Sequence, residues 1–252
     1  MYLKKLTILT ALAVSMGAAA SFASEDKAHW AYSGEAGPEH WGDLSAEYAT
    51  CATGRMQSPI DLAKADAAGE ISYEVDYKPV PLTILNNGHT IQFNTGGVGT
   101  LSEKDVEYKL LQIHFHAPSE HVVDGKHAPL EAHFVHRSDE GALAVLGVMF
   151  VEGAENPALA TLIAHMPASV SEPETIDGVT IDPAALLPED MDIYRYMGSL
   201  TTPPCSEGVN WHVLSQHVTA SKSQIEMLAT QLHKNFRPAQ PLNERLLVAP
   251  AD

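Results

Sequence analysis

Positively charged residues are scarce in this sequence. Its 252 residues include 15 Lys or Arg against 32 Asp or Glu, which gives a formal net charge of −17 at pH 7. A surface of this sign repels the phosphates of nucleic acids and of anionic lipids. We therefore expect neither nucleic acid nor a membrane as a partner. The chain also lacks internal repeats and low-complexity tracts, which favours one folded domain.

Cysteine is almost absent. Cys51 and Cys205 are the only two, so at most one disulfide can form within the chain. In an oxidising compartment, two cysteines of one domain are expected to pair. We therefore predict a disulfide between Cys51 and Cys205. Two unpaired buried thiols are the alternative.

An apolar run of more than ten residues occurs only near the N-terminus. Lys4 and Lys5 precede an apolar stretch at residues 6–20, and the small residues of Ser21-Phe22-Ala23 follow it. This order is typical of a secretory signal peptide. A membrane anchor is the alternative, although the stretch is short and rich in small residues. We predict a signal peptide at residues 1–23, one domain at residues 24–252 and a secreted protein.

Two stretches with a period of two residues carry three histidines. Residues 111–116 place His114 and His116 on one face, and residues 130–135 place His133 on a face of a second stretch. Alternate residues of a β-strand lie on the same side of the sheet. Three neutral imidazoles that converge there form the ligand set of a catalytic zinc site with a fourth position for water. A histidine-rich strand pair with ordinary surface residues is the alternative.

Two polar residues accompany these histidines. Gln112 precedes His114 by two positions and Glu131 precedes His133 by two, so both lie on the histidine face. An amide oxygen or a carboxylate can accept the ring N–H that metal binding leaves free. We therefore expect Gln112 and Glu131 to orient the neighbouring rings.

The rest of the chain predicts mostly strands. Further strands are expected at residues 71–77, 82–85, 90–94, 142–151 and 209–218. One helix should begin at Asn156-Pro157, with an N-cap followed by a first-turn proline. A second should begin near Ser223, where Ser223 and Glu226 have the spacing of a capping box.

Several short motifs follow one another from about Trp30 to the C-terminus. They are Gln57-Ser58-Pro59-Ile60-Asp61, Asn87-Gly88-His89, residues 112–116, Ser119-Glu120-His121, residues 131–136, Ser199-Leu200-Thr201-Thr202-Pro203-Pro204 and Asn235-Phe236-Arg237-Pro238-Ala239-Gln240-Pro241-Leu242. In order and spacing, the chain resembles an α-class carbonic anhydrase of the bacterial secreted type.

The resemblance implies a mainly β (α+β) single domain. Its core would be a large, twisted, mostly antiparallel central sheet of about ten strands, with a few short peripheral helices. It implies Zn²⁺ as the cofactor and reversible hydration of carbon dioxide to bicarbonate and a proton through zinc-bound hydroxide. It also implies a periplasmic location and inhibition by anions and sulfonamide-type compounds. A homodimer is expected by analogy with bacterial relatives.

The resemblance also assigns the residues that hold the metal. The zinc ligands fall on His114, His116 and His133. The groups that accept the free N–H of each ring fall on Gln112, Glu131 and the backbone carbonyl of Asn235.

The catalytic residues are assigned in the same way. Thr201 falls on a threonine that donates its hydroxyl proton to a carboxylate, here Glu120, and accepts a hydrogen bond from the attacking hydroxide. His89 falls on a proton-relay histidine. The pocket for carbon dioxide falls on Val135, Val145, Leu200, Thr201, Thr202, Val209 and Trp211.

Two other function classes stay open from the sequence. One is a non-catalytic binding protein on the same fold, although this chain keeps all three histidines. The other is a zinc hydrolase that acts on esters, which the same site could cleave in a minor side reaction.

Overall fold

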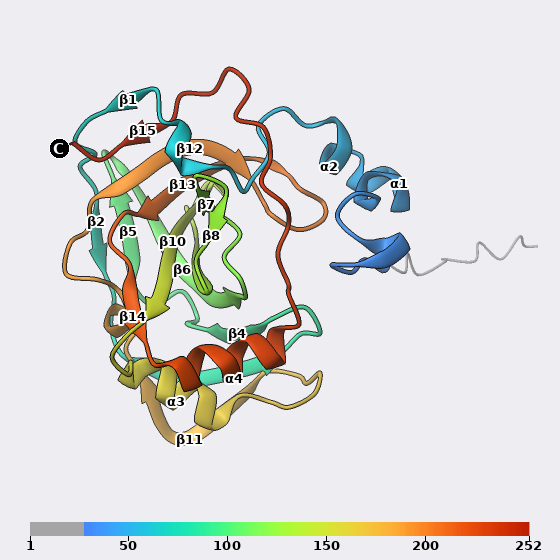
Figure 1. The fold of residues 1–252 in the computed structure, drawn as a ribbon. Coiled ribbons are helices and arrows are strands. Elements are labelled where there is room, and N and C mark those ends of the chain that lie inside the picture. The colour runs from blue at the N-terminus through green and yellow to red at the C-terminus, as the bar shows by residue number, and fades with distance from the viewer. Residues whose placement is uncertain (1–27, 252) are drawn as a thin grey trace, which may run out of the picture.

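One large sheet organises the chain (Figure 1). This computed structural model describes residues 28–251, so the predicted signal peptide at residues 1–23 lies outside the described residues. The strands are β1 (Ala67–Ala68), β2 (Glu74–Asp76), β3 (Val80–Asn86), β4 (Ile91–Asn94), β5 (Thr100–Glu103), β6 (Val106–His116), β7 (Val122–Val123), β8 (Lys126–His127), β9 (Leu130–Arg137), β10 (Leu143–Glu152), β11 (Glu174–Ile181), β12 (Ile193–Ser199), β13 (Glu207–Leu214), β14 (Val218–Ala220) and β15 (Val248–Ala249). The α-helices are α1 (Trp41–Leu44), α2 (Thr50–Thr53), α3 (Pro157–His165) and α4 (Lys222–Leu232).

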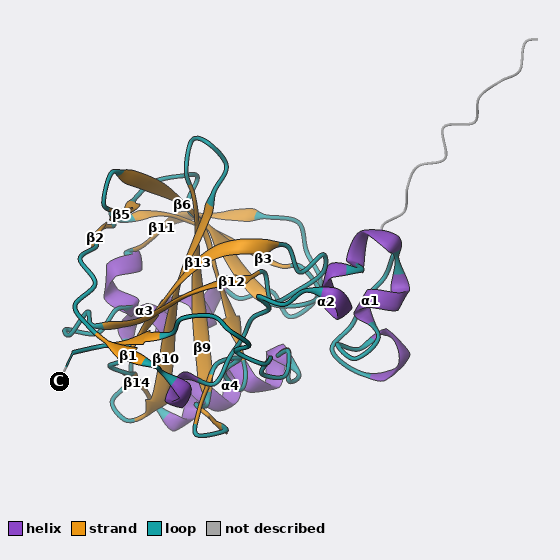
Figure 2. Cartoon of the chain, turned by 90° about the horizontal axis from the view of Figure 1, so that it is seen from above, coloured by secondary structure: helices purple, strands orange, loops and turns teal. Residues whose placement is uncertain are grey.

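The main sheet contains 13 strands, and its longest path runs β1-β15-β12-β13-β10-β9-β6-β4-β3-β11. The pairs of β1 with β15 and of β10 with β13 and β14 are parallel. The remaining pairs of this sheet are antiparallel. Figure 2 shows the strong twist of the strands and the short helices around them. The predicted mainly β domain with a central sheet of about ten strands is confirmed.

The antiparallel pair of β6 and β9 lies in the middle of this path. Its register places His114 opposite His133. On the far side of β9, Gly147 of β10 lies opposite His133. A Cβ atom at Gly147 would lie 3.1 Å from Oε1 of Glu131, so the glycine leaves room for that carboxylate. The strands predicted at residues 111–116 and 130–135 are thus parts of β6 and β9.

The two faces of the central strands pack against different apolar clusters. Phe134 is fully buried in a large cluster with Leu159 of α3 and Leu228 of α4. Val145 and Trp211, which are paired across β10 and β13, belong to a smaller cluster on the other face. Burying each such side chain contributes roughly 1.5–3 kcal/mol. Helices α3 and α4 lie side by side and cover the first face (Figure 1).

The start of α3 is as predicted, but the start of α4 is not. Asn156 caps α3 with its side-chain oxygen, and Pro157 occupies the first turn. The capping box predicted at Ser223 and Glu226 is wrong, because Ser221 and Gln224 form it. The Gln224 side chain accepts a hydrogen bond from the backbone N–H of Ser221. It also exchanges two hydrogen bonds with the backbone of Asn156, and this buried contact places the helix start two residues earlier.

Two predicted strands are shorter than expected. Of residues 71–77, only β2 pairs with a neighbouring strand. Residues 209–218 are divided between β13 and β14, because a bend at Ser215 and Gln216 separates the two strands. Among residues 28–251, no helix has the length and apolarity needed to cross a membrane.

Residues 28–54 form an arm at one side of the molecule, which carries α1 and α2 (Figure 1). Trp41, Tyr48 and both cysteines form its small apolar core. Cys51 and Cys205 are joined by a disulfide, with their Cα atoms 5.0 Å apart. The predicted pairing is confirmed, and the alternative of two free thiols is wrong. The bond ties the arm to the loop that follows Thr201.

Replacing both cysteines by serine should lower the free energy of unfolding. The bond spans 154 residues, and in the chain-entropy model a loop of this length is worth at most about 5 kcal/mol. Urea unfolding of the parent and of the double variant measures the difference. Equal midpoints, or two titratable thiols in the oxidised unfolded parent, would contradict this prediction.

Candidate metal centre

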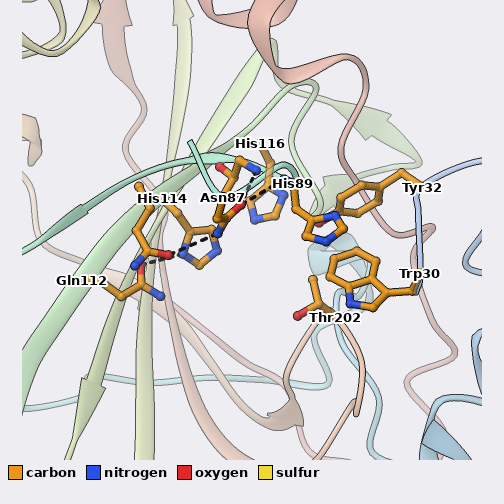
Figure 3. A pocket seen from close by; sticks show the side chains of 10 residues that line it. Trp30, Tyr32, Asn87, His89, Gln112, His114, His116 and Thr202 are labelled. Atoms are coloured by element: carbon orange, nitrogen blue, oxygen red, sulfur yellow. Dashed lines mark hydrogen bonds between the residues drawn. The ribbon is translucent and has the colours of Figure 1, made fainter. Parts of the chain in front are cut away.

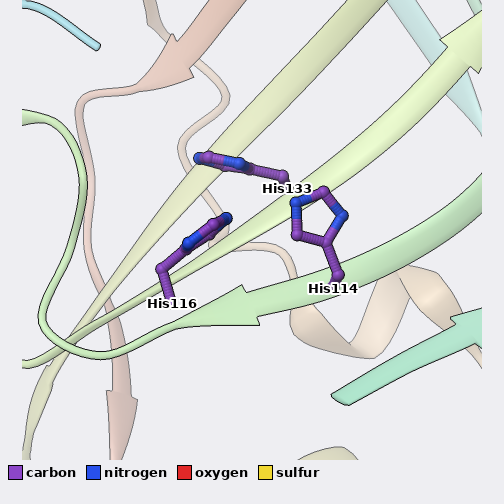
Figure 4. Close-up of side chains that lie close together, drawn as sticks. All are labelled: His114, His116 and His133. Atoms are coloured by element: carbon purple, nitrogen blue, oxygen red, sulfur yellow. The ribbon is translucent and has the colours of Figure 1, made fainter. Parts of the chain in front are cut away.

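Three histidine rings meet at the middle of the sheet (Figure 4). His114 and His116 come from alternate positions of β6, and His133 comes from the paired strand β9. One nitrogen from each ring lies within 4.8 Å of one nitrogen of each of the others. His116 and His133 are each 1% exposed and His114 is partly exposed, so the cluster is buried except on the side of His114. The structure brings together all three histidines singled out in the sequence.

The second nitrogen of each ring has a partner that fixes its proton. These pairs are His114 Nδ1 with Gln112 Oε1 (2.9 Å), His116 Nδ1 with the carbonyl oxygen of Asn235 (2.7 Å), and His133 Nε2 with Glu131 Oε1 (2.9 Å). Because the three partners are oxygen acceptors, the ring nitrogens that face them must donate. The other nitrogen of each ring then presents a lone pair.

The three rings are held in the neutral form that binds metals. Burial lowers the pKa of His114 well below its ordinary value, lowers that of His116 to about 4, and also lowers that of His133. Nε2 of His116 has no hydrogen-bond partner among the described residues. A buried polar atom without a partner is costly unless a ligand or water satisfies it. Three neutral imidazole lone pairs fit a tetrahedral zinc ion that keeps one open position.

Glu120 lies beside this cluster and is fully buried. Its Oε1 accepts a hydrogen bond from the backbone N–H of Arg237 at 2.8 Å. Its Oε2 lies 3.6 Å from Nε2 of His116 and has no hydrogen-bond partner among the described residues. Burial raises the pKa of Glu120 to about 7, against the opposing effects of His133 and Thr201. A cation held by the histidines would favour the ionised carboxylate.

Thr201 is buried and close enough to Glu120 to lower the pKa of that carboxyl. Among the described residues, no hydrogen bond of good geometry joins the Thr201 hydroxyl to the Glu120 carboxyl group. Oε2 of Glu120 has no partner within this part of the chain. The two residues are therefore neighbours, while the donation predicted from Thr201 to Glu120 stays a prediction.

A cleft of about 140 Å³ opens next to His114 and His116 (Figure 3). It is lined by Trp30, Tyr32, Asn87, His89, Thr90, Gln92, Gln112, His114, His116 and Thr202. Residues of the arm and residues of the sheet therefore line the same cleft. Such a concave site with a few polar groups is the usual form of a small-molecule pocket.

His89 lies on the wall of the cleft and is not part of the histidine cluster. The side chain of Asn87 holds its turn by accepting the backbone N–H groups of His89 and Thr90, both at 2.9 Å. The imidazole stacks on Trp30 with ring centroids 3.7 Å apart. Burial and the nearby His29 lower the pKa of His89, so the ring is neutral at pH 7.

The predicted apolar residues gather on the far side of the histidines. Val145, Val209 and Trp211 are buried in one cluster, and Val135 and Leu200 pack against it. The Trp211 ring lies 4.9 Å from that of His133. Trp211 Nε1 donates to the carbonyl of Ser199, which fixes the indole beside the loop of Thr201. The metal site therefore has one apolar side and one polar side.

His121 is a further residue of the site, and the sequence analysis assigned it no role. Its Nδ1 lies 2.7 Å from Oε1 of Glu131, and its Nε2 lies 2.8 Å from the hydroxyl of Tyr196. Burial alone would raise the pKa of Glu131, but the attraction and hydrogen bonds of His121 and His133 hold it well below its usual range. The only signal in the sequence was the tripeptide Ser119-Glu120-His121, in which Glu120 alone was assigned.

Known proteins match most of this chain in sequence and in fold. The family model for eukaryotic-type carbonic anhydrase matches residues 36–250. A carbonic anhydrase of Pectobacterium atrosepticum is 44% identical over 238 residues, which cover 94% of this chain and 97% of the relative. The solved α-carbonic anhydrase of Thermovibrio ammonificans, a complex with the inhibitor sulfanilamide, has 48% identity and a TM-score of 0.85, and the match covers 88% of this chain and 99% of that one. The solved α-carbonic anhydrase of Photobacterium profundum has 47% identity and a TM-score of 0.82, and the match covers 87% of this chain and 100% of that one. The chain therefore belongs to the eukaryotic-type, or α-class, carbonic anhydrase family, as its motifs predicted.

Proposed function

We propose that this protein hydrates carbon dioxide reversibly, with zinc held by His114, His116 and His133. The observation that carries the proposal is the convergence of three neutral ring nitrogens beside a cleft, each with its second nitrogen already hydrogen-bonded. When bound, zinc acts as a Lewis acid that lowers the pKa of water, a chemistry for which carbonic anhydrase is itself the standard example. The protein residues have to orient the reactants and move the proton.

Gln112, Glu131 and Asn235 keep the three rings in the binding tautomer. Each supplies an oxygen that can only accept from the ring, so each ring presents its lone pair to the metal. Glu131 is in turn held by two backbone N–H groups, those of Glu120 and His121, at 2.8 and 2.9 Å. The ligand rings are therefore fixed before a metal arrives.

Thr201 and Glu120 select what may sit next to the metal. An ionised Glu120 can only accept, so the Thr201 hydroxyl must donate to it and is left as an acceptor. A neighbour of Thr201 then has to carry a proton of its own, which favours water, hydroxide and bicarbonate over unprotonated anions. Their proximity beside the buried histidines supports this role.

The apolar side of the site suits carbon dioxide. Val135, Val145, Leu200, Val209 and Trp211 offer no buried donor or acceptor to a small non-polar molecule, apart from the indole N–H, which is already bonded. Thr202 lies on the cleft wall next to Trp30 (Figure 3) and borders the path of substrate entry. Sulfonamides, one of which is bound to the Thermovibrio relative, and inorganic anions are the inhibitors expected at this site.

His133→Ala should abolish zinc binding and hydration together, because it removes one of three ligands. The loss of a ring's hydrogen-bond partner alone costs about 10–100-fold in metal affinity, so the loss of the ring should cost more. Zinc content and stopped-flow hydration of purified parent and variant measure this. His40→Ala, which changes an exposed histidine of the arm, is the control and should match the parent. Parent activity in His133→Ala would contradict the proposed site.

Ester cleavage by the same site is a minor activity in this proposal. The pocket has an apolar wall sized for a small molecule and a narrow cleft of about 140 Å³. Comparing kcat/KM for carbon dioxide and for an activated ester in the same preparations ranks the two reactions. His133→Ala should lose both.

His89→Ala should slow proton removal and leave the encounter with carbon dioxide intact. His89 is neutral at pH 7 and lies on the cleft wall, so it can take a proton from the site and release it to solvent. We expect kcat to fall by at least about tenfold with kcat/KM nearly unchanged. Added imidazole should restore kcat in the variant and change little in the parent. A variant with full turnover in weak buffer would show that the proton leaves by another route.

We further propose that the chain is exported to the periplasm and loses residues 1–23. The basic, apolar and small-residue order of that segment supports export, and so does the disulfide. Intact mass and N-terminal sequencing after expression in a Gram-negative host should give a chain that begins at or near Ser24. Leu12→Arg, which interrupts the apolar stretch, should keep the full chain in the cytoplasm. A parent protein that retains Met1 would refute the cleavage.

A further inference from the structure

One irregular segment contacts three functional residues at once. Residues 235–237, here called the strap, follow α4 and lie outside helices and strands. The carbonyl of Asn235 accepts Nδ1–H of His116 at 2.7 Å, and the backbone N–H of Arg237 donates to Glu120 at 2.8 Å. The side-chain amide of Asn235 donates to the carbonyl of His89 at 3.0 Å. The strap therefore touches a metal ligand, the buried carboxylate and the relay turn.

The strap has little backbone pairing to hold it. The nearest backbone hydrogen bond that follows it is the N–H of Gln240 to the carbonyl of Pro59, at 2.8 Å. Figure 1 shows this red part of the chain running from α4 along the side of the molecule that faces the arm. Because the strap pairs with no neighbouring strand of the described chain, side-chain contacts have to hold it in position next to the site.

Two side chains supply that anchor. The Asn235 amide ties the strap to the end of β6, since it donates to the carbonyl of Phe115 at 2.9 Å and accepts the backbone N–H of Ala117 at 3.0 Å. The Arg237 side chain ties it to the arm and is 2% exposed. Nη1 donates to Oε1 of Gln57 at 2.8 Å and to the carbonyl of Ser58 at 3.0 Å, and Nη2 donates to the carbonyl of Cys51 at 2.9 Å. The guanidinium also lies over the Trp41 ring, 5.6 Å from its centroid. Burial lowers the pKa of Arg237 to about 10, which leaves the group charged at neutral pH.

We propose that Arg237 is a positioning residue for the metal site. By locking the strap to the disulfide-bonded arm, it sets where the Asn235 carbonyl meets His116 and where a backbone N–H meets Glu120. This inference rests on the proposed zinc function. A lysine could not replace the arginine fully. The forked guanidinium donates to three acceptors from two nitrogens, and a single ammonium cannot reproduce this arrangement.

Arg245 is a matched control within the same chain. It is also buried, at 9% exposed. It donates to the carbonyls of Leu242, Met197 and Pro241 at 2.9, 3.1 and 2.8 Å and lies 5.5 Å from the Tyr196 ring centroid. It bonds neither a proposed zinc ligand nor Glu120. The two arginines thus share burial, neutral acceptors and an aromatic partner, and they differ in that only Arg237 belongs to the strap that bonds His116 and Glu120.

The test compares Arg237→Lys with Arg245→Lys in the zinc-loaded protein. Both should lower the unfolding temperature. Only Arg237→Lys should speed zinc release to a chelator, by about tenfold, the lower range for disturbing a ligand's hydrogen-bond partner. It should also lower kcat/KM by a similar factor and weaken discrimination among inhibitory anions, whereas Arg245→Lys should stay within about twofold of the parent. Equal zinc release from the two variants, or parent behaviour in Arg237→Lys, would overturn the proposal.

A measurement without zinc separates this inference from the proposed function. In the zinc-free protein, the Nδ1 proton of His116 is held by the Asn235 carbonyl, and NMR can follow its exchange with water. Arg237→Lys should speed this exchange and Arg245→Lys should not, whether or not the parent hydrates carbon dioxide. If Arg237→Lys does not fold, Gln57→Met is the second variant. It keeps Arg237 but removes one of its acceptors, together with the donations of the Gln57 amide to the Cys205 carbonyl and to Glu207, and it should change proton exchange and zinc release in the same direction. Unchanged exchange and zinc release in that variant would also count against the anchor.

Discussion

The pairing of β6 with β9 is the constraint on which the site depends. Because side chains alternate across a strand, a slip of one residue would send His133 to the face that now holds Phe134. The apolar cluster under that face excludes such a slip, since Phe134 is fully buried there. The same register that fills the core therefore brings His114 and His133 opposite each other. Stability and metal geometry are set by one arrangement of hydrogen bonds.

Within residues 28–251, most polar groups around the histidines have hydrogen-bond partners, and two that lack one lie next to each other where a ligand would bind. Glu131 is buried with two histidines and two backbone N–H groups around it, so its charge is compensated. By contrast, Nε2 of His116 and Oε2 of Glu120 face each other at 3.6 Å, and neither has a partner among the described residues. Burying such atoms costs free energy. A cation next to both would offset that cost, so the folded chain is arranged to bind one.

The sequence predicted those parts of the site that follow from local periodicity. Parity alone placed Gln112, His114 and His116 on one face of their strand and Glu131 with His133 on one face of theirs, and in the structure these two faces lie on the same side of the sheet. The family resemblance, and not the pattern, supplied Asn235 and Thr201, because they lie on irregular segments without a period. The start of α4 was misplaced because Gln224 is fixed by Asn156, 68 residues away. Contacts of that separation leave no signal in a single sequence.

The same distinction explains how the site is held together. Strands β6 and β9 need no further support, since backbone hydrogen bonds and packing fix them. The Thr201 loop and the strap are irregular, and each has, besides its other hydrogen bonds, a link to the arm. These links are the Cys51–Cys205 disulfide and the hydrogen bond of Arg237 to the carbonyl of Cys51. Both links meet at Cys51, so the arm holds Thr201 and Glu120 in place from the same point. The arm lies far from the three histidines in the sequence, and it thereby positions the residues of the site that do not belong to the sheet.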